Sequence, residues 1–338
     1  MLLATTRRTH RRNQRPHHPP MAIGEFELIA RYFTPPVRRA VLGVGDDCAL
    51  LAPGAGMQLA ISSDMLVEGR HFLPTVASAD LGHKALAVNL SDLAACGATP
   101  LAFSLALALP RADEDFLAGF ARGLLALARE HDCELVGGDT TQGPLNICIT
   151  VIGEVPAGQA LLRSGAQAGD DLYVSGALGD ARLALECLRG NVALPGDGFS
   201  VVRRAMERPQ PRVALGVALR GLASSAIDVS DGLLGDLGHI LRRSDVGATI
   251  HVDAVPRSAV LVGTPLTLQR ECTLAGGDDY ELLFTAPARR ADEVRAAARR
   301  AGVNVTAIGR IEAAPGMRLS DAEGASVPDT FVSFDHFR

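Results

Sequence analysis

Lysine is nearly absent from this chain of 338 residues: Lys84 is its single example, and no glycine precedes it. A Gly-Lys-Ser/Thr phosphate-binding loop is therefore excluded. A nucleotide bound by this protein would have to be held through metal ions rather than through the lysine of such a loop.

Tryptophan is missing, and aromatic residues make up only 4% of the chain. An aromatic platform for stacking single-stranded nucleic acid is therefore not expected. The longest apolar runs, such as residues 105–109, are far shorter than the roughly 20 residues that cross a bilayer as a helix. The sequence predicts neither a nucleic-acid partner nor insertion into a membrane.

Cysteine pairs are also missing, because the six cysteines are scattered and no two form a Cys-x-x-Cys motif. This spacing supports neither a zinc ribbon nor a dithiol redox motif. Isolated cysteines in a chain that is 47% hydrophobic usually serve as small core residues. We therefore expect free thiols and a reducing, cytoplasmic location.

Positive charge is concentrated at the start of the chain. Residues 1–20 carry five arginines and no acid, so the net charge of −5 becomes −10 for the remainder. We expect residues 1–20 to be a disordered basic tail, from an extended start before Met21 rather than a transit peptide. The acidic remainder disfavours binding to a phosphate backbone and suits recruitment of divalent cations.

Alternating strand and helix patterns predict two domains, residues 21–155 and 160–338, with a boundary near 156–169. The first reads as an α/β or α+β unit. Helices are expected at 25–33, 79–96, 113–130, 180–189, 213–220, 232–243 and 291–301. Strands are expected at 58–62, 101–109, 134–136, 145–155, 171–175, 226–229, 280–285 and 305–308, and residues 190–200 are expected to be a loop.

Six short acidic motifs punctuate these elements, nearly all beside glycine or serine. They are Gly45-Asp46-Asp47, Ser62-Ser63-Asp64, Asn89-Leu90-Ser91-Asp92, Gly137-Gly138-Asp139, Asp228-Val229-Ser230-Asp231-Gly232 and Gly276-Gly277-Asp278-Asp279-Tyr280-Glu281. Each alone is typical of a turn or a helix N-cap, as Asp231 illustrates. Adjacent acids repel, however, and Asp92 opposes the dipole at the end of its helix. Together the motifs predict a shared site for hard cations such as Mg²⁺.

Phosphoryl transfer suits these residues, because it requires positioning and charge neutralisation more than covalent help from the protein. Arg163 is a candidate clamp, since guanidinium binds phosphate oxygens in a bidentate way. No Ser-His-Asp set is evident, so we expect no side chain to be an obligatory general base. Lys84 stands roughly 12 Å from Asp92 along the same predicted helix, and we expect it at the surface or in an ion pair.

The ordered series of motifs resembles the thiamine-monophosphate kinase family. The matching segments are Gly45-Asp46-Asp47-Cys48-Ala49, Ser62-Ser63-Asp64, His71-Phe72, Asn89-Leu90-Ser91-Asp92, Gly137-Gly138-Asp139-Thr140-Thr141, Arg163-Ser164-Gly165, the segment from Ile227 to Gly232, the segment from Gly276 to Glu281, and Phe334-Asp335-His336-Phe337. The resemblance covers essentially everything after the basic tail. Each motif is weak alone, but their order is specific.

The resemblance implies a fold and an activity. The fold is that of the aminoimidazole-ribonucleotide-synthetase-like ATP-binding superfamily: an N-terminal α/β domain, whose sheet pairs with its twin in a homodimer, and a C-terminal α+β domain. The activity is ATP-dependent phosphorylation of thiamine monophosphate to thiamine diphosphate by direct transfer, assisted by several Mg²⁺ ions.

The resemblance also implies roles for particular residues. The metal ligands would be Asp47, Ser62, Ser63, Asp64, Asp92, Asp139, Asp228 and Asp231. Gly138, Asp139, Arg163 and Ser230 would contact the nucleotide, while His71, Asp278 and Phe331 would contact the thiamine substrate. Three positions depart from the family pattern, which usually has Thr at Ser63, Glu at Asp278 and often Trp at Phe331. The side chain of Asp278 is one methylene shorter than that of the usual Glu.

Two alternatives remain at this stage. One is a sister enzyme of the superfamily: a purine cyclo-ligase, a selenophosphate synthetase or a hydrogenase-maturation protein. The other is a non-catalytic protein that binds nucleotides or divalent cations on the same scaffold. His71 and the terminal Phe334-Asp335-His336-Phe337 segment favour the thiamine enzyme.

Overall fold

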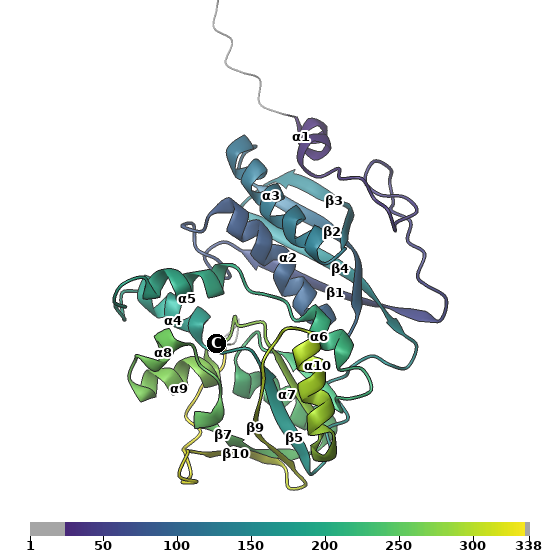
Figure 1. The fold of residues 1–338 in the computed structure, drawn as a ribbon. Helices are drawn as coiled ribbons and strands as arrows, with labels where there is room; N and C mark the ends of the chain where they lie inside the picture. Colours follow the sequence, from purple (N-terminus) through teal and green to yellow (C-terminus); the bar gives the residue numbers. More distant parts are fainter. Residues whose placement is uncertain (1–23, 335–338) are drawn as a thin grey trace, which may run out of the picture.

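The computed structural model describes residues 24–334, so the predicted basic tail of residues 1–20 lies outside the described part. Two β-sheets organise the chain, one from residues 57–156 and the other from residues 170–320. In Figure 1 the first sheet and its helices lie above the second, with α2 and α6 at the junction. The sheets agree with the two expected domains, while the exact boundary near 156–169 stays a prediction.

The first sheet has four strands and one helix-covered face. Its strands are β1 (Met57–Val67), β2 (Thr99–Leu109), β3 (Glu134–Gln142) and β4 (Asn146–Pro156), in the order β1-β4-β2-β3. Strands β2 and β3 are parallel, and the other neighbours are antiparallel. Helices α2 (Ser78–Ala95) and α3 (Glu114–Glu130) lie side by side along the sheet, and α1 (Glu25–Tyr32) packs near α3 (Figure 1).

Helix α2 is buried along most of its length. It crosses α3 with the two backbones in contact, since a Cβ added at Gly82 would lie 2.1 Å from the Phe120 carbonyl oxygen and one at Gly123 would lie 1.8 Å from that of Ala79. Its opposite side meets the second domain, where Leu86 and Leu90 share a core cluster with Leu215 and Phe284. Apolar contact on both sides fixes the direction of the polar residues at the end of this helix.

The second sheet has six strands in the order β10-β7-β9-β5-β8-β6. They are β5 (Asp170–Ser175), β6 (Ser225–Asp228), β7 (Gly247–His251), β8 (Leu282–Pro287), β9 (Val305–Glu312) and β10 (Gly316–Ser320). The helices of this half are α4 (Asp180–Leu188), α5 (Gly198–Glu207), α6 (Val213–Ala218), α7 (Leu233–Ser244), α8 (Ala259–Val262), α9 (Leu266–Ala275) and α10 (Ala291–Arg300). No helix among residues 24–334 is both long and apolar enough to cross a membrane.

Every helix and strand predicted above is present, but two predicted strand ends are wrong. Strand β1 continues to Val67 because β4 pairs with all of it, so Ser62-Ser63-Asp64 lies inside the strand and not at its end. Strand β3 likewise includes Gly137-Gly138-Asp139. The predicted loop at 190–200 ends early, because helix α5 begins at Gly198, with Asp197 as its N-cap residue. Helices α5, α8 and α9 and strands β7 and β10 were not predicted.

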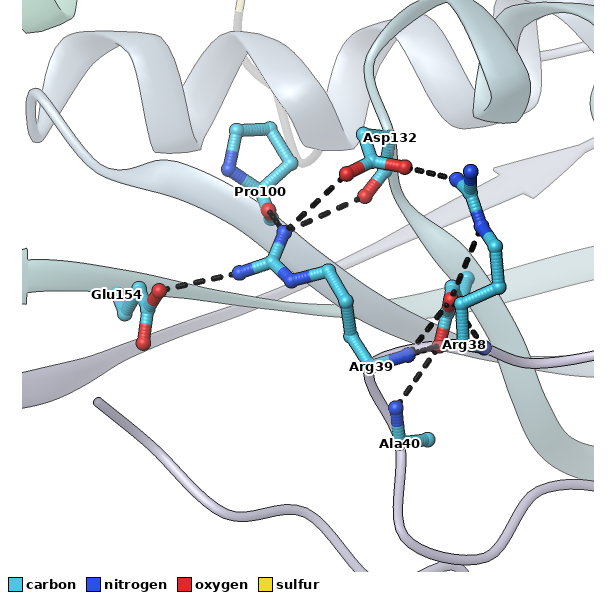
Figure 2. A network of polar contacts seen from close by, with 7 residues as sticks. Arg38, Arg39, Ala40, Pro100, Asp132 and Glu154 are labelled. Carbon is cyan, nitrogen blue, oxygen red and sulfur yellow. Dashed lines mark hydrogen bonds and ion pairs between the residues drawn. The ribbon is translucent and has the colours of Figure 1, made fainter.

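The segment before β1, which carries Asp46 and Asp47, is anchored to the first sheet by a polar network (Figure 2). The Glu134 carboxylate accepts hydrogen bonds from three consecutive backbone N–H groups, those of Arg38, Arg39 and Ala40, at 2.6, 3.0 and 2.9 Å. The Arg39 guanidinium donates to the Pro100 carbonyl at 2.9 Å and to Glu154 at 3.0 Å. This anchoring holds the segment on the β2–β3 side of the sheet.

Candidate active site

The junction between the two domains contains two hollows on either side of a group of carboxylates. One has a volume of about 370 Å³, and its lining includes Asp64, His71, Ser230, Asp231 and Tyr280. The other, of about 360 Å³, has Ser62, Asp92, Cys96, Arg163 and Asp228 in its lining. Both volumes lie in the usual range for small-molecule sites. We call them the Tyr280 hollow and the Arg163 hollow.

The last turns of α2 connect the carboxylates of the two domains. Ser91 donates a hydrogen bond to Asp228 at 2.7 Å, and Ser62 donates to Asp92. The side-chain oxygen of Asn89 accepts from the backbone N–H of Asp64 at 3.1 Å. No separate role was predicted for Asn89 and Ser91, although their spacing from Asp92 within one helical turn was a signal that they share its surroundings.

Burial and mutual repulsion raise the pKa values of these carboxyl groups. Burial raises the pKa of Asp64 to about 6, and the charges of Asp92 and Asp231 add to the shift. Burial is also the main cause that raises the pKa of Asp92 and of Asp228, and the charge of Asp92 adds to the shift at Asp228. The ionised forms are therefore unfavourable together unless positive charge is brought to them.

The donor set fits Mg²⁺ in part. Among residues 24–334, no three His, Cys, Asp or Glu side chains are already grouped to hold an ion. Magnesium, however, is usually held by one or two carboxylates together with substrate phosphates and water. Oxygen donors whose ionised forms are unfavourable, as at Asp64, Asp92 and Asp228, suit an ion that arrives with a phosphate substrate.

Asp236 was not predicted, yet it shapes the turn that follows β6. Its carboxylate accepts hydrogen bonds from the backbone N–H groups of Ser230, Asp231 and Gly232, at 3.1, 3.2 and 3.2 Å. The N-cap of α7 is Gly232, without a side-chain hydrogen bond, so the simple N-cap interpretation of Asp231 is wrong. Asp231 instead lines the Tyr280 hollow. An Asp in the first turn of the helix was the available sequence signal.

Arg163 lies in the Arg163 hollow, close enough to Asp92 for its charge to oppose the raised pKa of that carboxyl group. Its segment is held by Ser244, which donates to the Arg163 carbonyl at 3.3 Å and accepts from the Gly165 N–H at 3.1 Å. Its role as a phosphate clamp stays a prediction.

Four residues that were predicted to bind metal or nucleotide lie apart from the group of carboxylates at the domain junction within a single chain. Side chains alternate across a strand, so Ser63 points to the opposite face of β1 from Ser62 and Asp64 and contacts Thr150 on β4. Asp139 and Gly138 are on β3, separated from β1 by β4 and β2, a distance on the order of 14 Å. Asp47 is exposed in the anchored segment.

The three residues predicted to contact thiamine lie in different surroundings. His71 lines the Tyr280 hollow. Phe331 packs against the core of the second domain, while the backbone N–H of Phe334 donates to the Asp231 carbonyl at 3.0 Å. Phe334 is therefore tied to the turn that carries Asp231, and Asp335, His336 and Phe337 lie outside the described residues. Asp278 forms an ion pair with Lys84.

Lys84 is buried, so its expected place at the surface is wrong, whereas the expected ion pair is confirmed. The reason is that α2 packs on both sides, against α3 and against the second domain. The helix therefore has no wide solvent face in its middle.

The raised pKa of Asp64 predicts a pH-dependent stability. An acid whose pKa is higher in the folded state binds more protons when folded. Its contribution to the free energy of unfolding therefore falls as pH rises from about 4 through about 6. In EDTA, Asp64→Asn is expected to be more stable than the parent by roughly 1–3 kcal/mol at pH 8, and the gain should shrink towards pH 4.5.

Denaturant unfolding at both pH values measures this difference. Burial lowers the pKa of His83 and His131, so their effect on stability has the opposite pH dependence, and it cancels when the parent's free energy of unfolding is subtracted from that of the variant. Saturating Mg²⁺ at pH 8 should stabilise the parent more than the variant. A stability difference that is the same at both pH values would contradict the prediction.

Comparison with known protein families identifies the family to which the chain belongs. Residues 45–155 match the model of the AIR synthase related protein N-terminal domain, and residues 167–322 match that of the C-terminal domain. The two domains are therefore those of an AIR synthase related protein. The chain is 46% identical over 335 residues to the thiamine-monophosphate kinase of Salmonella typhimurium, covering 94% of this chain and 99% of that protein. It belongs to the thiamine-monophosphate kinase family.

Solved structures agree. The crystal structure of thiamine-monophosphate kinase from Stenotrophomonas maltophilia superposes with a TM-score of 0.80 at 46% identity, over 86% of this chain and 92% of that one. AaThiL complexed with AMPPCP and TMP superposes with a TM-score of 0.74 at 30% identity, over 85% and 89%. The hydrogenase maturation protein HypE of E. coli, with a TM-score of 0.71 at 22% identity over 91% and 94%, shares the fold.

Proposed function

We propose that this chain transfers the terminal phosphoryl group of ATP to thiamine monophosphate and so makes thiamine diphosphate. The observation that carries the proposal is the pair of hollows joined by carboxylates from both domains. Two anionic substrates need two adjoining sites and neutralisation of charge between them. The family of the chain and the AaThiL complex with AMPPCP and TMP support the choice of substrates.

We assign the Arg163 hollow to the nucleotide and the Tyr280 hollow to thiamine monophosphate. Arg163 is the cation of the first hollow, and a guanidinium suits phosphate oxygens. His71 and Tyr280 give the second hollow a polar, aromatic wall for a heterocycle. Ser230 lines the second hollow, so we place it between the two phosphate groups.

The residues of the chain act mainly by positioning. Asp64, Asp92, Asp228 and Asp231 would hold Mg²⁺, which would supply positive charge to neutralise the phosphate groups of the substrates. Ser91 and Ser62 orient Asp228 and Asp92 through the hydrogen bonds described above. Asp236 keeps the turn at Ser230 in place. No proton has to be removed by a side chain, because a phosphate oxygen of the substrate is the nucleophile.

We also propose a homodimer joined through the open face of the first sheet. On β1 this face exposes Leu59, Ile61 and Met65, which retain 43%, 64% and 53% of their accessible surface. Neighbouring apolar side chains at such exposure are typical of an interface. Ser63 and Asp139 belong to the same face, so a second copy offers them neighbours that one chain does not. Sedimentation at micromolar concentration tests the dimer, and a monomer would contradict it.

The activity test is direct. The protein, Mg²⁺ and ATP labelled in the terminal phosphate are incubated with thiamine monophosphate, and thiamine diphosphate and ADP are separated and counted. We expect one labelled thiamine diphosphate for each ADP, and no transfer in EDTA. ADP that accumulates without labelled thiamine diphosphate would overturn direct transfer.

Parallel incubations address the alternatives. Turnover that requires a purine precursor or selenide would favour a sister enzyme, and binding without turnover would favour a non-catalytic protein. The free cysteines of the described part, two of them buried, agree with the proposed cytoplasmic location.

A further inference from the structure

The ion pair between Lys84 and Asp278 joins the two domains below the Tyr280 hollow. The Lys84 ammonium donates to Asp278 Oδ2 at 2.6 Å, with 3% of the lysine side chain and 34% of the aspartate side chain exposed. Lys84 lies in the middle of α2, and Asp278 lies in the loop that leads into β8. The pair is therefore buried at the lysine end and partly exposed to solvent at the aspartate end.

The loop that carries Asp278 is strained and held firmly. Asp278 and Tyr280 have φ angles of +63° and +53°, which are uncommon for residues other than glycine. Their backbone N–H groups donate to the carbonyls of Ser230 and Val229 at 2.7 and 2.9 Å. Such conformations persist where the surroundings determine them, and they concentrate at functional sites. The loop is thus bound along its backbone to the turn that carries Ser230 and Asp231.

Tyr280 connects this loop to the Tyr280 hollow. Burial raises the pKa of its hydroxyl, and the charges of Asp278, Asp64 and Asp228, together with a hydrogen bond to Asp278, raise it further. The phenol is therefore neutral and lies close to all three carboxylates. Asp278 is held between the Tyr280 hydroxyl and the Lys84 ammonium.

An ammonium at this place meets an electrostatic need. The surrounding carboxylates repel one another, and burying a charge is costly unless it is paired. Lysine brings a compact charge on a flexible stem, which reaches Asp278 from the middle of α2. Lys84 can thereby neutralise Asp278, while Asp64, Asp92 and Asp228 face the phosphate side.

We infer that Lys84 is a positioning residue: its ammonium fixes the Asp278 carboxylate, which in turn holds Tyr280, so that Tyr280 presents a preformed wall to the organic part of the substrate. Of these three residues only Tyr280 lines the hollow. The inference rests on the proposed function only in naming thiamine monophosphate as that substrate. Lys84 itself does not line the hollow. Its effect is therefore expected on substrate affinity rather than on transfer.

Lys84→Met is the informative variant, because it removes the charge at the buried end and leaves Asp278 partly hydrated. We expect KM for thiamine monophosphate to rise at least about tenfold, with kcat and KM for ATP within about threefold, the pattern of lost binding that is equal in ground and transition states. Lys84→Arg should recover part of the affinity. In the double variant Lys84→Met/Asp278→Asn the losses should not add, because the two residues act as one unit.

The matched control is Asp80→Asn. Asp80 lies one turn before Lys84 on α2 and also bonds to the second domain, through Arg208 at 2.8 Å, but it lies outside the Tyr280 hollow. If Lys84 merely held the domains together, both variants would lower the melting temperature and change both KM values alike, which would overturn the inference. We expect Asp80→Asn to leave both KM values unchanged.

A second measurement needs no variant. Because the chain has a single lysine, protein grown with ¹³C,¹⁵N-lysine gives one side-chain ammonium signal in NMR. We expect this signal to exchange slowly with water and to shift on addition of thiamine monophosphate. The shift should saturate at the same thiamine monophosphate concentration as the binding measured by calorimetry. A rapidly exchanging signal, or one that thiamine monophosphate leaves unchanged while calorimetry shows binding, would overturn the inference. Absence of turnover by the parent would instead count against the proposed function.

Discussion

Asp92→Asn is expected to lower kcat by about 1000-fold or more while leaving the fold intact. The carboxylate lies in the wall of the Arg163 hollow, next to Ser62 and within the influence of Arg163. Removing one group that neutralises charge in the transition state typically has an effect on the order of 100- to 1000-fold, and a metal ligand has a larger one. Steady-state turnover at saturating ATP and thiamine monophosphate measures the loss.

Stability separates this effect from misfolding. Because burial raises the pKa of Asp92, its ionised form is unfavourable in the folded protein, and an amide of the same shape avoids that cost. The melting temperature of Asp92→Asn in EDTA at pH 8 should equal or exceed that of the parent. Asp292→Asn, on the exposed surface of α10, is the control and should change neither quantity. Near-normal turnover of Asp92→Asn at limiting Mg²⁺ would refute a central role for Asp92.

Gly138→Ala is expected to destabilise the first domain by roughly 2–4 kcal/mol, because contact with backbone adds to conformational strain. Gly138 has φ = +148°, and a Cβ there would lie 1.8 Å from the Leu105 carbonyl oxygen. Neither the Leu105 backbone nor β3 can move without disturbing the pairing of β2 with β3. Urea unfolding measures the loss.

The neighbouring residue provides the control. A Cβ at Gly137 would meet nothing within 4 Å, so Gly137→Ala should change stability by less than about 1 kcal/mol. If Gly138 served only to contact the nucleotide, as the motif alone suggested, Gly138→Ala would retain its stability and raise KM for ATP. The pair of variants therefore distinguishes a strand-pairing requirement from direct contact with the nucleotide.

The strand and helix pattern of the chain was largely readable from the sequence. Helices α2 and α3 have clear apolar spacing, and β4 is a long β-branched run, so short-range signals were enough. The two strands that were missed have a common cause. Strands β7 and β10 pair with each other across a separation of more than sixty residues, and their short segments show little pattern alone. Helix α5 was missed for another reason: it starts two residues after Pro195-Gly196, which indicated a loop.

The site was predictable in composition but not in arrangement. The motifs around Asp64, Asp92, Asp228 and Asp231 were recognised, and the structure brings them to one cleft. The error at Ser62-Ser63-Asp64 arose because the strand end was placed too early, which hid that Ser63 points to the other face. Asn89, Ser91 and Asp236 were overlooked because their hydrogen bonds join segments whose proximity exists only after folding.

The sequence by itself determined the kind of chemistry, since carboxylates beside small residues and a lack of lysine already favour phosphates held through Mg²⁺. Tertiary structure alone decided which acids meet, which face Ser63 occupies, and that Lys84 is buried against Asp278. The physical reason is that residue type sets what a side chain can bind, whereas the packing of α2 between two domains sets its neighbours, its solvent and hence its charge state.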